Sequence, residues 1–296
     1  MMFLDLRLRS LTVEAPKLTV RRDAAGAIYI AGMQISGGTA GGGFSDWVLG
    51  QREIVVRGAE IEWRDEKRAA PPLALHAVNF RLRNTGDKHS MGLSARPPDP
   101  LGADLELRAE LIGRSVADLA AWNGQVYLDI GNTDLAGWRA WVDYPVDLQR
   151  GQGALRLWAT LGGGMPRRVT ADVALTGVAV RLAENLPLLE LQSVRGRLKA
   201  RATANGYEVS GDNLALTRAQ GASMRPTSFS VAWQPASGQT PERGSANANL
   251  IELEPLAELA TFLPFPASLR KLLEELAPRG NLLDFNFTWS GPLAEA

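Results

Sequence analysis

Apolar and polar side chains alternate along most of this chain, and this alternation limits the folds that the chain can adopt. In "ADLELRAEL", Leu105, Leu107 and Leu111 are separated mostly by charged residues, and "GALRLWATL", "TSFSVAWQ" and "NLLDFNFTWS" repeat the pattern. Successive residues of a β-strand point to opposite faces of a sheet, so each segment is predicted to be a strand with one apolar and one wet face. Because parallel strands buried on both faces have continuous apolar runs, the pattern favours an antiparallel sheet.

Turn signals such as "NTGDKH" and "RPPDPLG" separate the predicted strands, and from Glu53 to Leu111 they leave no room for a helix. This stretch is therefore predicted to be a meander, preceded by a glycine-rich loop, "SGGTAGGGFSDW". Helices are predicted only in short segments, which are "SVADLAAW", "TDLAGWRAWV", "EPLAELATFL" and "PASLRKLLEELAPRG". The last of these is amphipathic with mixed charge, and we expect it to pack on the sheet.

The order of these signals predicts a mainly β fold, a long twisted antiparallel sheet with a few short α-helices. Residues 1–112 are expected to form the N-terminal meander, and residues 113–165 a helix-containing connection that returns to a strand. Residues 166–296 are expected to form a second β segment that ends in amphipathic helices and a final strand. The three parts are predicted to make one continuous elongated unit.

Composition excludes several classes of function. Lys and Arg number 32 and so do Asp and Glu, which leaves no long-range field to gather nucleic acid. The chain has no cysteine and only His76 and His89, so thiolate zinc sites and multi-histidine metal centres are not expected. We therefore predict no metal, no cofactor and no nucleic-acid partner.

The pattern of the sequence predicts neither a signal peptide nor a membrane span within it. Its first residues alternate charge and leucine in place of an unbroken apolar stretch, and no apolar run approaches the ~20 residues that cross a bilayer. If the protein works outside the cytoplasm, its anchor and targeting segment are expected to lie outside this sequence.

One acidic stretch, "EIEWRDEKRAAPPLALHAVNFRLRN", resembles half of an active site. It holds three carboxylates close to a tryptophan and a histidine, namely Glu62, Asp65, Glu66, Trp63 and His76. A retaining glycosidase needs two carboxyl groups about 5–5.5 Å apart, one of them with a raised pKa. The flanking cations Arg64, Lys67 and Arg68 favour ionised carboxylates instead. We therefore interpret the stretch as a β-hairpin with a solvated, charged tip.

No other motif supports catalysis. The glycine run is followed by Phe44, Ser45 and Asp46 in place of the Gly-Lys-Ser/Thr of a phosphate loop. No nucleophile elbow or acidic calcium loop is present. Tryptophans on predicted strands suit either sugar stacking or packing, and packing is favoured for Trp63, Trp158, Trp233 and Trp289. We predict no catalytic residue and no enzymatic activity, and a carbohydrate-active enzyme is kept only as a minor hypothesis.

Several phrases occur in an order that resembles a known family. They are "WVLGQREIVVRGAEIEWRDEKRAAPPLAL", "FRLRNTGDKH", "SARPPDPLG", "WNGQVYL", "GWRAW", "GQGALRLW" and "LAPRG". From about Trp47 to Pro292 the chain resembles the central periplasmic region of YhdP proteins of Gram-negative bacteria, which belong to the AsmA-like group. Family members are several times longer and begin with an inner-membrane helix, so the chain resembles an internal segment of one.

The resemblance implies a function. AsmA-like proteins are similar to bridge-like lipid-transfer proteins, in which a gutter-shaped β-sheet carries acyl chains between membranes. It implies a periplasmic segment of an inner-membrane-anchored protein that carries phospholipid between the inner and outer membranes and supports outer-membrane lipid homeostasis and the permeability barrier. The alternative is a closed β-rich scaffold that binds envelope proteins without conducting lipid.

An open gutter or groove and a closed core both need the same alternating strands, so the sequence leaves the two open. The residues predicted to line either lipid or core are Ile54, Val56, Ile61, Trp63, Val78, Phe80, Leu105, Leu107, Leu155 and Leu157.

Overall fold

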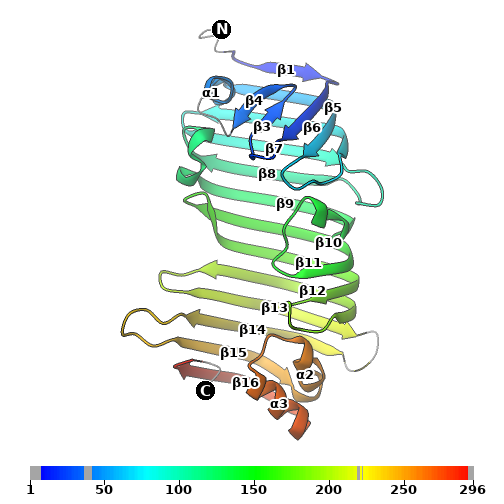
Figure 1. The fold of residues 1–296 in the computed structure, drawn as a ribbon, viewed down its shortest axis with the longest axis vertical. Coiled ribbons are helices and arrows are strands. Elements are labelled where there is room, and N and C mark those ends of the chain that lie inside the picture. Colours follow the sequence, from blue (N-terminus) through cyan, green and yellow to red (C-terminus); the bar gives the residue numbers. More distant parts are fainter. Residues whose placement is uncertain (1–7, 37–41, 219–220, 222, 293–296) are drawn as a thin grey trace. The chain divides into compact units, whose positions relative to one another are not determined.

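The computed structural model describes residues 8–36, 42–218, 221 and 223–292. Strands make up 59% and helices 14% of the structure, which confirms the mainly β prediction. In the described part of the chain, 16 strands form one mixed sheet that is not closed into a barrel. The strand order is β16-β15-β14-β13-β12-β11-β10-β9-β8-β7-β6-β5-β2-β3-β4, and β1 also pairs with β5 (Figure 1).

The chain divides into two compact units. Unit 1 comprises residues 1–133, 137–143 and 156–167, and unit 2 comprises residues 134–136, 144–155 and 168–296. The elements of unit 1 are β1 (Leu11–Glu14), β2 (Lys17–Arg22), β3 (Ile28–Ile30), β4 (Met33–Ser36), α1 (Gly42–Gly50), β5 (Glu53–Asp65), β6 (Leu73–Thr85), β7 (Lys88–Arg96), β8 (Leu105–Ile112), the 3₁₀ helix η1 (Val116–Ala121), β9 (Asn123–Asp134) and the 3₁₀ helix η2 (Gly137–Ala140). Strand β10 (Asp147–Gly162) contributes to both units.

Unit 2 continues with β11 (Met165–Arg181), whose first residues belong to unit 1, and then with β12 (Leu189–Ala202), β13 (Tyr207–Arg218), β14 (Met224–Gln234), β15 (Arg243–Glu252), α2 (Leu253–Leu259), the 3₁₀ helix η3 (Ala260–Phe262), α3 (Ala267–Leu276) and β16 (Asn281–Ser290). Strands β11 to β16 pair antiparallel with their sequence neighbours.

Strands β5 to β9 pair antiparallel in chain order, so the segment of residues 53–111 has the strand pairing of a meander. Strands β1 and β2 run parallel to β5, which the alternation did not predict. Two of the predicted helices, after Ser115 and after Leu135, are only short 3₁₀ turns, η1 and η2.

The glycine-rich segment before β5 is in part a helix, so the loop prediction was wrong for residues 42–50. Glycine disfavours helix formation, and contacts with the rest of the fold stabilise this helix in spite of its glycine content. The side chain of Asn84 on β6 donates to the carbonyl oxygens of Val48 and Gln51, at 3.0 and 2.6 Å. The buried amide of Gln51 donates to the carbonyl of Trp47 at 2.7 Å. The preceding residues 37–41 lie outside the described part.

Tryptophans close both strand ends in unit 1. At one end, buried Trp122 stacks on buried His89 with ring centroids 5.3 Å apart. At the other end, the Nε1 of buried Trp138 donates to Thr133 Oγ1 at 2.8 Å, and Thr133 in turn donates to the carbonyl of Leu101. These two tryptophans thus cover opposite ends of the strands.

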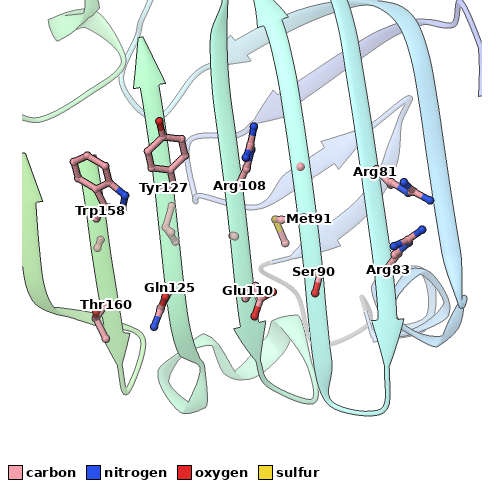
Figure 2. A pocket seen from close by; sticks show the side chains of 14 residues that line it. Arg81, Arg83, Ser90, Met91, Arg108, Glu110, Gln125, Tyr127, Trp158 and Thr160 are labelled. Carbon is pink, nitrogen blue, oxygen red and sulfur yellow. The ribbon is translucent and has the colours of Figure 1, made fainter. Parts of the chain in front are cut away.

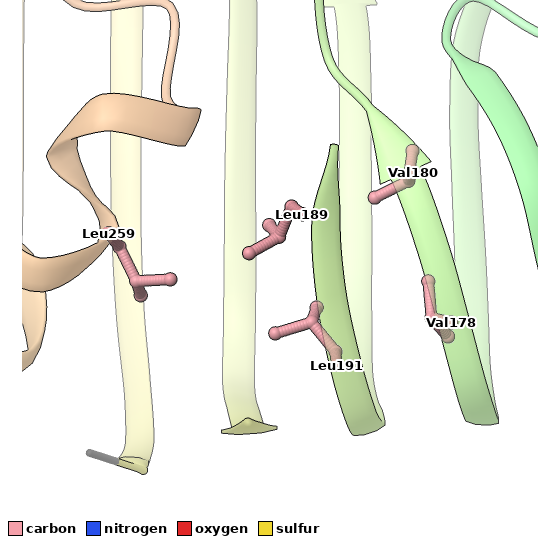
Figure 3. Close-up of a cluster of buried hydrophobic side chains, with 5 residues drawn as sticks. All are labelled: Val178, Val180, Leu189, Leu191 and Leu259. Carbon is pink, nitrogen blue, oxygen red and sulfur yellow. The ribbon is translucent and has the colours of Figure 1, made fainter. Parts of the chain in front are cut away.

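In unit 2 the core lies where α2 packs on the strand ends. Leu259 of α2, with only 1% of its surface exposed, forms one buried cluster with Val178, Val180, Leu189 and Leu191 (Figure 3). Val178 stands opposite Leu191 and Val180 opposite Leu189 across β11 and β12, so the helix packs on an apolar patch that the two strands form together.

Candidate functional site

An apolar row crosses five strands of unit 1 at right angles to the chain direction. Its members stand directly opposite one another in the β-ladder, in the order Val56, Phe80, Leu93, Leu107 and Leu128. We call this set the unit-1 row. Directly opposed side chains on one face of a sheet are close neighbours, so the row forms a continuous apolar strip.

The unit-1 row is half-buried, whereas several of the residues beside it are buried. Ile54 and Leu82 on one side are 8% and 3% exposed. Leu105 and Ile130 on the other side are 9% and 7% exposed. The closures at the strand ends therefore leave the middle of the apolar face accessible to a ligand.

A β-bulge keeps β5 in this arrangement. The register between β5 and β6 shifts between Val56 and Ala59, where Gly58 adopts a positive φ of 60°. The extra residue reverses the alternation, so Val56 and Ile61 reach the same face although an odd number of positions separates them. A side chain at position 58 would be strained, because L residues rarely adopt this φ.

The opposite face of unit 1 is polar and is crossed by ion pairs. Lys88 pairs with Glu110 at 2.8 Å, and Arg156 pairs with Asp129 at 3.0 Å. Glu53 pairs with two arginines, and its Oε1 lies 2.7 Å from Nη2 of Arg81 and 2.9 Å from Nε of Arg83. Hydrogen bonds from Arg83 and Arg81 lower the pKa of Glu53 to about 2 from its ordinary value of 4.5.

This pKa predicts a pH dependence of stability. A carboxylate whose pKa is lower in the folded state stabilises the fold above its unfolded pKa, and the contribution is lost as pH falls through the folded pKa. The free energy of unfolding of the parent protein should therefore fall as the pH decreases from about 4.5 to 2. In Glu53→Gln this fall should be smaller, because the titrating carboxylate is absent. Urea unfolding of both proteins across this range measures the effect, and superimposable profiles would contradict it.

Unit 2 carries a comparable row with greater exposure. Val209, Val231, Ala246 and Phe287 stand opposite one another across β13 to β16. We call these residues the unit-2 row. Val209 is 47% exposed and Phe287 is 42% exposed, so this row is open to solvent.

Aromatic rings extend this surface. Tyr207 opposes and stacks on Trp233 with centroids 6.4 Å apart, and Phe287 stacks between Phe285 and Trp289. Trp289 lies over Gly244, where a Cβ atom would stand 1.9 Å from the indole ring. Glycine is therefore required at this position to let the indole lie flat on the sheet.

The structure places the ten sequence-predicted residues at different depths. Val56, Phe80 and Leu107 belong to the unit-1 row, while Ile54, Val78 and Leu105 are buried. The remaining four, all half-buried, are Ile61, Trp63, Leu155 and Leu157. Arg156 contacts Asp129 and Trp158 contacts Tyr127 on the polar face, so Leu155 and Leu157 point to the other side of β10.

Sequence reasoning missed several accessible apolar residues of the two rows. Leu93 and Leu128 complete the unit-1 row, but only the register shows that they oppose Leu107. The alternation in "TSFSVAWQ" and "NLLDFNFTWS" does mark Val231 and Phe287, and their exposure depends on what packs over them. Packing was the wrong expectation for Trp158 and Trp233, which are 38% and 39% exposed.

The acidic stretch is a hairpin, as predicted, but one of its carboxylates is not solvated. Asp65 has a side chain only 1% exposed and forms a two-pronged ion pair with Arg22, whose Nε lies 2.8 Å from Oδ1. Parallel pairing of β2 with β5 places these two residues opposite each other. Glu62 and Glu66 do lie in water, paired with Arg64 and Arg21, and His76 pairs with Glu60 at 2.5 Å.

Helix α3 packs less than expected. Only Leu273 of its leucines is buried, whereas Leu269, Leu272 and Leu276 are 37%, 51% and 66% exposed. These three lie on one stripe of the helix, so α3 presents an apolar side to solvent.

The described residues contain no helix that is long and apolar enough to cross a bilayer. Within the same residues, no group of three or more His, Asp or Glu side chains is placed to hold a metal ion.

Comparison with known proteins gives one result. No curated protein and no solved structure matches the chain significantly. The model of the YhdP family, described as "YhdP protein", matches residues 2–295, which is almost the entire sequence. The chain therefore belongs to the YhdP family.

Proposed function

We propose that this chain is a periplasmic segment of a bridge-like protein whose apolar rows carry phospholipid acyl chains between the inner and outer membranes. In this proposal it supports outer-membrane lipid homeostasis and the permeability barrier, acts without catalysis, and is anchored in the inner membrane through a segment outside this sequence. Membership of the YhdP family suggests a bridge-like lipid-transport role in a general sense.

The observation that supports the proposal is the one-sidedness of the sheet. In unit 1 the apolar row lies on one face, and exposed ion pairs such as Lys88–Glu110 and Arg156–Asp129 lie on the other. Leu107 and Arg108 show this on adjacent positions of β8. Removing apolar surface from water is favourable by about 25 cal/mol of free energy per Å², so an uncovered apolar strip favours binding of an apolar ligand. Exposed apolar patches larger than a few hundred Å² mark interaction sites in soluble proteins.

The alternative is an interaction module that binds envelope proteins. The exposed leucine stripe of α3 favours it, because an amphipathic helix with a free apolar side is a common protein-binding element. The half-buried and exposed strand rows favour lipid instead, because acyl chains bind to apolar side chains that stay accessible on a sheet.

Photo-crosslinking on adjacent residues tests the proposal. We expect a photoreactive amino acid at Leu107 or Val231, introduced into the full-length protein in cells, to give phospholipid adducts. The matched controls are Arg108 and Ala232, which follow these residues on the same strands and point to the opposite face. Adducts are identified by mass spectrometry of the purified protein. Protein adducts at Leu107 and Val231, or equal lipid adducts at the control positions, would favour the interaction module.

A further inference from the structure

One aromatic pair of unit 1 lies on the polar face of the sheet, opposite the unit-1 row. Trp158 and Tyr127 lie on the polar face, 5.4 Å apart and tilted by 47°, next to the Arg156–Asp129 ion pair. Trp158 is 38% exposed. The proposed lipid surface is on the other face, so lipid binding gives no reason for an exposed indole here. Residues that break a local pattern without packing benefit are candidates for a binding role.

The aromatic pair borders a hollow in the polar face. The hollow has a volume of about 450 Å³, within the usual range for small-molecule sites. Figure 2 shows Trp158 and Tyr127 at one side of it and Arg81 and Arg83 at the other. Gly92 lies between them on β7, and a Cβ atom built there would meet nothing within 4 Å. The missing side chain therefore leaves the floor open.

The arginine side of the hollow has a surplus of positive charge. Arg81 and Arg83 share one carboxylate oxygen, Glu53 Oε1, which accepts from Arg81 Nε and Nη2 at 2.9 and 2.7 Å and from Arg83 Nε at 2.9 Å. Within the described part of the chain, Arg83 donates through Nε alone, which leaves its two terminal amino groups for a ligand. Such a fork matches the geometry of a carboxylate.

The other lining groups are hydrogen-bonding and nearly neutral in sum. Arg108 pairs with Glu106 and Glu110 pairs with Lys88, both at 2.8 Å. Ser90, Gln125 and Thr160 add uncharged donors and acceptors around the floor. Because the charges of these lining groups nearly cancel, they give little long-range attraction for an anionic membrane surface. Short-range contacts therefore determine what binds in the hollow.

We propose that this hollow binds an acidic oligosaccharide, with a sugar ring against the Trp158–Tyr127 pair and a sugar carboxylate on Arg81 and Arg83. The aromatic faces match the apolar C–H face of a pyranose, and the polar side chains of Ser90, Gln125 and Thr160 can bind its hydroxyl groups. The site lies on the opposite face from the unit-1 row, so it is independent of the proposed lipid function.

Isothermal titration calorimetry with defined sugars tests the site. The probes are tetragalacturonate and a muramic-acid-containing disaccharide, with maltotetraose as the neutral control. We expect the full chain to bind an acidic probe more tightly than the neutral one. Trp158→Ala should weaken binding about tenfold or more. Arg83→Gln should remove the preference for the acidic sugar.

A steric variant and its control keep the test independent of folding. Gly92→Leu should abolish binding by filling the floor. Gly131→Leu should leave binding unchanged, because Gly131 on β9 has equally open surroundings and is not among the residues that line the hollow. Circular dichroism checks that each variant is folded. The proposal is overturned if neither acidic probe binds at millimolar concentration, if Gly92→Leu and Trp158→Ala bind like the parent, or if phosphatidylglycerol vesicles bind through Arg83 while the sugars do not.

Discussion

Replacing Leu259 by alanine is expected to lower the free energy of unfolding of unit 2 by about 2–5 kcal/mol. The side chain is 1% exposed and fills the space between α2 and the paired residues of β11 and β12. Truncation removes its apolar contacts and leaves a cavity, and short α2 has no side-chain cap to hold it in place. We therefore expect α2 to separate from the strand ends before the sheet unfolds.

Hydrogen exchange measured by mass spectrometry checks this result. Amides of α2 and of the adjacent ends of β11 and β12 should exchange faster in Leu259→Ala, while amides of unit 1 should be unchanged. Leu276→Ala is the matched control, because this leucine lies on α3 with 66% of its surface exposed and should change stability by only about 0.5 kcal/mol or less. Equal effects of the two substitutions would show that the packing of α2 is not what stabilises this end.

Replacing Asp65 by alanine is expected to lower the stability of unit 1 by about 3 kcal/mol, at the lower end of the range for breaking a buried ion pair. The carboxylate is buried, and its loss leaves the Arg22 guanidinium against the ring of Trp63 without its counter-charge. It also removes the acceptor for the backbone N–H of Arg68, at 3.2 Å. The lower end applies because the Arg22 side chain is 26% exposed and water can partly solvate it.

Urea unfolding followed by tryptophan fluorescence measures the change. The control is Glu66→Ala in the same hairpin, whose pair with Arg21 is exposed on both sides and should contribute about 0.2–1 kcal/mol. Arg22→Met offers a second comparison, since it removes the cation and leaves the buried Asp65 carboxylate without its ion-pair partner. The interpretation fails if Asp65→Ala is no more destabilising than Glu66→Ala.

Asp65 also shows where the sequence stops being informative. Alternation predicted the hairpin and the faces of its strands, because period two is a local property of the chain. The burial of Asp65 depends on Arg22, which lies 43 positions earlier and arrives only through parallel pairing of β2 with β5. Local spacing holds no information about such a partner.

The same distinction applies to the candidate sites. Leu107 and Phe80 could be assigned to an apolar face from their neighbours, but their half-burial depends on which segments fold over the sheet. The bulge at Gly58 decides that Val56 and Ile61 share a face. The C-terminal end of helix α1 is fixed by Asn84 of β6, which donates to the carbonyl of Val48 in the helix and to that of Gln51 just after it.

Ion pairs between neighbouring strands of unit 2 also have a consequence for how the strands find their partners. Asp172 stands directly opposite Arg197, and Arg201 directly opposite Glu208, in a sheet of repetitive leucine- and valine-rich strands. Exposed pairs of this kind add little stability. A slip of one residue, however, would turn every side chain of a strand to the other face and expose the apolar row to the wrong side. Opposite charges face each other only in the native strand register. These ion pairs therefore favour the register that keeps the polar and apolar faces of the sheet separate.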